Sequence, residues 1–100
     1  MQYECLTLHV TSGGYRFALA CTNPAVLEWI ETEIQSSRPY CSFSSGSQLS
    51  CTFDIVKYEP LEIGWWLVRS LCEQGWEPFG SVSWEESWGL EFISLRRSIP

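Results

Sequence analysis

Apolar side chains alternate with polar or small ones near the start of the chain, which is the pattern of strands with one buried face. Residues 3–10 and 15–21 are rich in β-branched, aromatic and cysteine residues. Between them, Ser12-Gly13-Gly14 is typical of a hairpin turn. The pattern therefore predicts an N-terminal β-hairpin.

The apolar period then changes to that of a helix. Asn23 can cap this helix and Pro24 suits its first position. Arg38-Pro39 ends it, because proline disfavours the helical conformation in the residue before it. The buried stripe is expected to consist of Val26, Ile30 and Ile34.

The same succession of helix and hairpin fills the rest of the chain. A second hairpin is predicted over residues 40–58, with its turn in a Ser/Gly-rich stretch. A second helix is predicted over residues 61–74, with Gly75 as its left-handed C-terminal cap. The last hairpin is expected to consist of strands 78–84 and 88–96 around the turn Glu85-Glu86-Ser87.

The predicted order of elements is thus ββαββαββ. Helices packed on one face of an antiparallel sheet bury the apolar sides of both layers. We therefore expect an α+β fold: a two-layer sandwich of a mostly antiparallel six-stranded sheet with two helices on one face. A ferredoxin-like core with an extra strand at each end uses the same elements. Residues 1–100 are expected to form a single domain, because this length supports one modest core.

Within that domain, residues 24–56 and 61–95 are predicted to be two copies of one helix-hairpin unit, an internal repeat. Apolar positions coincide when the helices are shifted by 37 residues and the hairpins by 39. The matched pairs include Val26 with Ile63, Trp29 with Trp66, Ile30 with Leu67, Ile34 with Leu71, Cys51 with Leu90, Phe53 with Phe92, and Val56 with Leu95.

The chain is tryptophan-rich, with six such residues, and three of them have no counterpart in the first copy. Trp65 aligns with a glutamate and points away from the buried stripe of its helix, and Trp84 and Trp88 flank the last turn. One interpretation is that these rings cover the sheet edge or each other. The other is that they anchor a protein partner, since exposed tryptophan is enriched at binding hot spots. Trp29 and Trp66 are expected at the edge of the core.

Charged residues complete the candidate partner-binding surface. Arg69 shares its side of the helix with Trp65, and Glu85 and Glu86 occupy the last turn. An acidic turn beside exposed aromatic rings favours a partner with a basic or apolar docking surface. The partner-binding residues predicted from sequence are therefore Trp65, Trp84, Trp88, Glu85, Glu86 and Arg69.

Charge and hydropathy exclude several classes of partner. The net charge is −6, with only six Lys and Arg residues, so nucleic acid and anionic membrane surfaces are poor partners. No stretch approaches the roughly 18–20 apolar residues of a membrane span. The first residues lack the basic and apolar regions of a signal peptide, which predicts a cytoplasmic protein with five free thiols.

Residue types that carry chemistry are present but not clustered. The cysteines are widely spaced and His9 is the only histidine, so no metal site, cofactor or cysteine nucleophile is expected. Asp54 lies within a strand pattern, where it is expected to face solvent beside Lys57 or Arg69. The alternative is that it is buried like its counterpart Ile93 and needs a polar partner. We expect no enzyme activity.

Residues 61–97 carry one recognisable motif: a helix, then Gln74-Gly75-Trp76-Glu77, a hairpin, and a strand that closes on Arg96-Arg97. This pattern resembles small bacterial domains of unknown function and, more distantly, the raftlin proteins, which are membrane-raft scaffolds. The resemblance implies a non-enzymatic module. Membrane anchoring of the raftlin kind is not implied, because Met1-Gln2 is no acylation signal.

These observations lead to one functional hypothesis and one alternative. The chain is predicted to be a non-enzymatic protein–protein interaction module, a subunit or scaffold or adaptor in a cytosolic complex. The alternative is a small-molecule-binding domain with an aromatic cleft between helices and sheet. A homodimer formed through an exposed edge strand is also possible.

Overall fold

The structure is a computed structural model, and it describes residues 2–37, 41–45, 49–55, 60–80, 82–85 and 89–99. Within these ranges, only the backbone is described for residues 37, 41, 43–45, 60–62, 84 and 85. The elements are β1 (Gln2–Thr11), β2 (Arg16–Cys21), α1 (Pro24–Ser37), β3 (Cys41–Ser45), β4 (Ser50–Ile55), α2 (Pro60–Glu73), β5 (Glu77–Pro78), β6 (Ser83–Glu85) and β7 (Gly89–Ile99).

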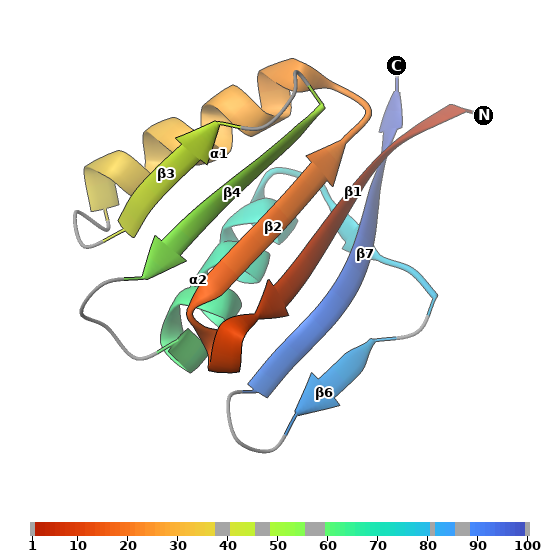
Figure 1. The fold of residues 1–100 in the computed structure, drawn as a ribbon. Helices are drawn as coiled ribbons and strands as arrows, with labels where there is room; N and C mark the ends of the chain where they lie inside the picture. The colour runs from red at the N-terminus through yellow and green to blue at the C-terminus, as the bar shows by residue number, and fades with distance from the viewer. Residues whose placement is uncertain are drawn as a thin grey trace.

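The strands form one antiparallel sheet in the order β3-β4-β2-β1-β7-β5, with β6 also paired to β7. The N-terminal hairpin β1-β2 lies at the centre of this sheet. The hairpin β3-β4 pairs with β2 on one side, and β7 with its short partners pairs with β1 on the other. Both helices lie on one face of the sheet (Figure 1).

This architecture confirms an α+β sandwich with an antiparallel sheet and two helices, but the predicted count of six strands is wrong for the described residues. Seven strands are present, because the segment predicted as one strand, residues 78–84, is divided into β5 and β6. Gly80 lies between the two with a left-handed φ of 73°, which interrupts an extended strand.

The ferredoxin-like alternative with an extra strand at each end is also wrong in its strand order. A ferredoxin-like core built from β2, β3, β4 and the strand predicted at residues 78–84 would place that fourth strand beside β2. In the structure β1 takes this place beside β2, and the two strands found within residues 77–85, β5 and β6, pair with β7. The first strand of the chain is therefore central rather than peripheral.

The helix ends follow the sequence closely. Asn23 caps α1, with the Ala25 N–H donating to its Oδ1 at 3.0 Å. After α2, Gly75 has a φ of 91°, and the Trp76 N–H donates to the Leu71 carbonyl at 3.1 Å. Trp76 is 3% exposed, so its ring seals the end of the helix. Both predicted caps are confirmed.

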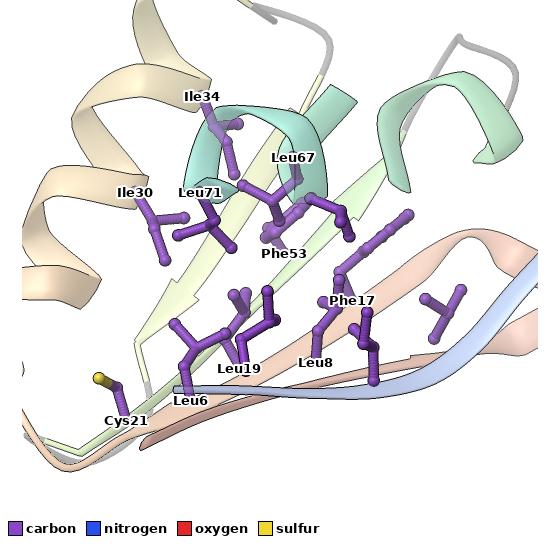
Figure 2. Close-up of a cluster of buried hydrophobic side chains, with 14 of the residues drawn as sticks. Leu6, Leu8, Phe17, Leu19, Cys21, Ile30, Ile34, Phe53, Leu67 and Leu71 are labelled. Carbon is purple, nitrogen blue, oxygen red and sulfur yellow. The ribbon is translucent and has the colours of Figure 1, made fainter. Parts of the chain in front are cut away.

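The core lies between the helices and the sheet (Figure 2). Leu6 and Leu8 of β1 project toward the helices and pair across with Leu95 and Ile93 of β7. Trp29 and Trp66 pack against the edge of this core, as predicted. The helix residues that close the core over the sheet are Val26, Leu27, Ile30, Ile34, Ile63, Leu67, Val68 and Leu71.

Burial corrects the alignment of the two predicted copies. A spacing of 39 matches Phe53 with Phe92, but Phe53 is fully buried and Phe92 is half-buried. The buried residue of β7 nearest this position is Ile93, which corresponds to a spacing of 40. A slip of one residue exchanges the two faces of a strand, and both positions in β7 are apolar, so hydropathy alone did not fix the register. The duplication itself stays a prediction.

One-sided burial makes a quantitative prediction for β1. Leu8→Ala should lower the free energy of unfolding by about 2–5 kcal/mol, because the side chain is fully buried. Its neighbour Thr7 faces the other side of the sheet, and Thr7→Ala should cost less than about 1 kcal/mol. Urea denaturation of both variants checks this, and equal losses would contradict burial on one face only.

Two glycines near the ends of α2 should respond in opposite directions. Gly75→Ala should destabilise the fold by about 1–2 kcal/mol, because an alanine is strained at a φ of 91°. Gly64→Ala should stabilise it by about 0.5–1 kcal/mol, since the helix gains alanine propensity. A methyl group there would meet Phe17 at 3.6 Å, an ordinary contact. Thermal denaturation distinguishes the two, and a loss of stability in Gly64→Ala would contradict the packing described.

Candidate functional site

No described helix or strand covers the side of the sheet opposite to the helices (Figure 1). Because side chains alternate along a strand, this side presents the odd-numbered residues 3–11 of β1 and the even-numbered residues 16–20 of β2, 50–54 of β4 and 92–98 of β7. We call these residues, with Glu77 and Phe79 beside them, the open face. Most of them are small or carry hydroxyl groups.

A cluster of aromatic rings and one guanidinium forms the bulky half of the open face. The guanidinium carbon of Arg96 lies 4.4 Å from the centre of the Tyr3 ring and 5.6 Å from that of Phe79. Tyr3 is 38% exposed and Phe79 36% exposed. Further along the strands, His9 meets Phe92 edge to face at 5.9 Å. This second contact lies four residues from Arg96 along β7, and we call the five residues of the two contacts together the aromatic cluster.

On the opposite half of the open face the side chains stand only a short distance off the sheet, because Ala18, Ala20 and Thr52 are small residues. We call this the low half. A shallow hollow of about 310 Å³ opens there. Its rim carries Leu49, which is 50% exposed. The hollow is lined by Cys5, Thr7, Ala20, Cys21, Thr22 and Leu49.

The charges described on the open face are paired with each other. Arg96 donates to Glu77 at 2.9 Å, a hydrogen bond that raises the pKa of the guanidinium. Arg16 donates to Asp54 at 2.8 Å, and this hydrogen bond lowers the pKa of the carboxyl. The face therefore carries equal numbers of positive and negative charges among these four residues.

The ion pair of Asp54 corrects the partner expected from sequence. Asp54 is partly exposed on the open face, as predicted, but its partner is Arg16 rather than Lys57 or Arg69. The pairing of β2 with β4 places Arg16 directly opposite Asp54, which local sequence spacing could not reveal. Lys57 lies outside the described residues.

A second candidate site is a pocket of about 210 Å³ near the start of α1 and the end of α2. Arg97 lies 4.8 Å over the ring of Trp76 and donates to the Gln74 carbonyl at 3.1 Å. We call it the terminal pocket. It is lined by Asn23, Ala25, Val26, Trp29, Gln74, Trp76 and Arg97.

The polar groups beside the terminal pocket form one network. Arg97 Nε donates to Glu4 Oε1 at 2.6 Å, and Asn23 donates to the other oxygen of Glu4 at 3.1 Å. Burial raises the pKa of Glu4, but the hydrogen bonds from Asn23 and Arg97 and the charge of Arg97 outweigh it and lower the pKa. The Glu4 side chain is 12% exposed, and its hydrogen bonds from Asn23 and Arg97 favour the ionised form of the carboxylate.

Burial shields two of the described thiols from ionisation. Burial raises the pKa of Cys51 to about 11 and also raises the pKa of Cys21, so both thiols resist ionisation. Cys5 and Cys72 are likewise free thiols. Among the described residues no three metal-ligating side chains lie together.

The structure separates the partner-binding residues predicted from sequence. Trp65 and Arg69 lie one turn apart on α2; Trp65 is 37% exposed, as expected, and Arg69 is exposed. Trp84 and Glu85 belong to β6 at the sheet edge, where only their backbone is described. Glu86 and Trp88 lie outside the described residues. Trp65 and Arg69 therefore lie in the helix layer, whereas Trp84 and Glu85 lie in the sheet (Figure 1).

The aromatic cluster is the feature that the sequence argument missed. The usable signal is the alternation along β1, which puts Tyr3, Cys5, Thr7 and His9 on one side of the strand. The alignment of the two predicted copies instead treats Phe92 only as the apolar match of Phe53. The alternation of side chains along the strands, rather than the unmatched tryptophans, identifies the open face.

No protein-family model matches the chain, and no curated protein matches it. Neither helix, within the described residues, combines the length and apolar composition needed to cross a bilayer. The assignment of function therefore depends on the geometry of the open face and of the terminal pocket.

The ionised state of Glu4 predicts a pH dependence of stability. Because the pKa of Glu4 is lowered on folding, its contribution is present above the ordinary carboxyl value, about 4.5, and is lost as the pH falls through the folded value. Glu4→Gln should therefore cost about 1–3 kcal/mol at pH 7, and the difference from wild type should shrink below about pH 4.

Denaturation between pH 3 and pH 7 measures this difference. Glu31→Gln, an exposed change on α1, is the control and should cost less than about 0.5 kcal/mol at every pH. A Glu4→Gln deficit that stays constant down to pH 3 would contradict the role of the charge.

Proposed function

We propose that the chain is a non-enzymatic protein–protein interaction module, a subunit or scaffold of a cytosolic complex, and that it docks its partner through the open face. The observation that carries this proposal is the aromatic cluster, in which Tyr3 and Phe79 remain more than one third exposed around Arg96. Tyrosine, tryptophan and arginine are the residue types most enriched at binding hot spots.

The surroundings of the cluster support the same function. The face is broad, and its small Ala, Ser and Thr side chains allow close approach of another surface. Arg96 is oriented by Glu77 and by the two rings beside it, so little side-chain entropy remains to be lost on binding. A preorganised anchor on a broad face suits a folded protein partner better than a small solute.

Trp65 and Arg69 provide a second, smaller patch on the helix layer. They lie on the other side of the molecule from the aromatic cluster, so one compact partner would not reach both. In the proposal, the open face carries the main interface. The patch on α2 and the predicted residues Trp84, Trp88, Glu85 and Glu86 stay candidates for further contacts.

Small-molecule binding at the terminal pocket is the second candidate function. The rings of Trp29 and Trp76 favour it, since they line a recess between the helix ends, as an aromatic cleft would require. Two features weigh against it. The volume, about 210 Å³, is below the roughly 300–1,000 Å³ of most ligand pockets. The guanidinium of Arg97 is already engaged by Glu4 and Gln74.

Capture of partners by the tagged chain, expressed in the cells that naturally produce it, tests the proposal. The double variant Tyr3→Ser/Phe79→Ser should lower the recovery of wild-type partners by at least about tenfold, because it removes two anchors of the interface. Tyr15→Ser is the matched control, since this tyrosine is 49% exposed and lies at the hairpin turn off the open face.

The melting temperature of each variant should be measured beside its capture, so that unfolding is not mistaken for lost binding. Equal recovery of every partner by wild type and the double variant would contradict docking through the open face. A small molecule that co-purifies with wild type but not with Arg97→Ala, detected by native mass spectrometry, would favour the second candidate.

A further inference from the structure

We propose that the partner of the open face is a second copy of the chain, and that two copies pack open face to open face about a two-fold axis. This inference rests on the proposed function, because it names the occupant of the same face. It differs from pairing through an edge strand, because the sheets would stack instead of being extended.

The shape of the open face is self-complementary. Its bulky half, with Tyr3, Phe79 and Phe92, lies on β1, on β7 and directly after β5, and its low half, with Ala18, Ala20 and Thr52, lies on β2 and β4. A two-fold axis parallel to the strands, between β1 and β2, places β1 over β2 and β7 over β4 of the other copy. Each bulky half then meets a low half.

The register of the strands brings bulky residues of one copy over small residues of the other. Phe92 is opposite His9, His9 is opposite Ala18, and Ala18 is opposite Thr52. An axis parallel to the strands preserves this height. With β7 over β4 and β1 over β2, Phe92 of one copy therefore lies over Thr52 of the other, and His9 lies over Ala18.

Charge also favours the open face over the helix layer as the surface between copies. Each copy has a net charge of −6, so two copies repel unless the surfaces that meet are nearly neutral. In the described part of the helix layer the exposed acids outnumber the exposed bases: the acids are Glu28, Glu31 and Glu73, and the base is Arg69. On the open face the two arginines are each paired with a carboxylate.

The same pairing disfavours a nucleic acid as the occupant. Aromatic rings on an open sheet can stack bases, but phosphate binding needs cations that are available to neutralise it. Arg16 and Arg96 are each engaged by Asp54 or Glu77. A neutral protein surface fits these paired charges better.

The size of the face suits a stable dimer. Six strands about 4.8 Å apart and about six residues long cover about 29 Å by 20 Å, or about 580 Å² in projection. Side chains that stand off a sheet expose more surface than its projection. The area therefore approaches the roughly 800 Å² per partner of a standard interface. Two stacked sheets whose strands run nearly parallel, as this axis places them, are a common packing arrangement.

Sedimentation velocity of the 100-residue chain over a range of concentrations tests the proposal. Wild type should sediment as a dimer that dissociates on dilution. Ala20→Arg, an exposed change at the hollow, should weaken the dimer by at least about tenfold, because it places unpaired like charges in the interface. Ser36→Arg, which adds the same charge at an exposed site on α1, should leave the dimer intact.

Site-resolved alkylation supplies a second measurement that does not depend on a variant. Cys5 lies on the open face and Cys72 is exposed on α2. Alkylation of Cys5, but not of Cys72, should slow as wild-type protein is concentrated. Equal rates at all concentrations would contradict burial of the open face between copies.

Three other outcomes would overturn the proposal. Wild-type protein that stays monomeric at every concentration would contradict the dimer. If the Tyr3→Ser/Phe79→Ser variant then still fails to capture a different protein that wild type captures, the interaction module stands and only the identity of its partner is wrong. A dimer that Ala20→Arg leaves intact would indicate edge pairing. Salt-dependent binding of a single-stranded oligonucleotide by wild type, lost in Arg96→Ala, would assign the face to nucleic acid.

Discussion

The rest of the structure depends on one constraint: the strands send their large apolar side chains to the same side of the sheet. Leu6 and Leu8 face the helices, and their cross-strand neighbours Leu95 and Ile93 do the same. Because a strand has only two sides, this leaves the aromatic cluster and otherwise mainly polar and small residues on the other. The core and the open face therefore both follow from the alternation of side chains along the strands. A register slip of one residue would exchange the side chains of the two faces.

The Glu4–Arg97 network connects the first and last strands to the ends of both helices. Glu4 and Arg97 are opposite each other in the pairing of β1 with β7, Asn23 precedes α1, and Gln74 follows α2. The helix caps and this partly buried ion pair therefore meet at one place, where Arg97 lies against the ring of Trp76. The charges are tolerated there because each has hydrogen-bonding partners, as a nearly buried carboxylate requires.

Features set by local residues were predictable from the sequence, whereas those set by strand pairing were not. Asn23 and Gly75 act on their own helices, so their capping roles could be derived without knowing the fold. The choice between Phe92 and Ile93 as the buried residue of β7 depends on its pairing with β1. The aromatic cluster joins β1, β5 and β7 from both ends of the chain, so no local pattern could assemble it.

Tryptophan is the residue type that suggested a docking surface, and three of the six tryptophans have a structural role instead. Two helices, each about 10–12 Å wide, span less than a seven-stranded sheet with strands about 4.8 Å apart. Wide side chains at the flanks of the helix layer extend its cover, and Trp29, Trp66 and Trp76 lie there, packed against or inside the core. The need to cover a broad sheet with few helices therefore accounts for these three rings without a partner, and the open face, built largely of small residues, is the surface where a partner gains most.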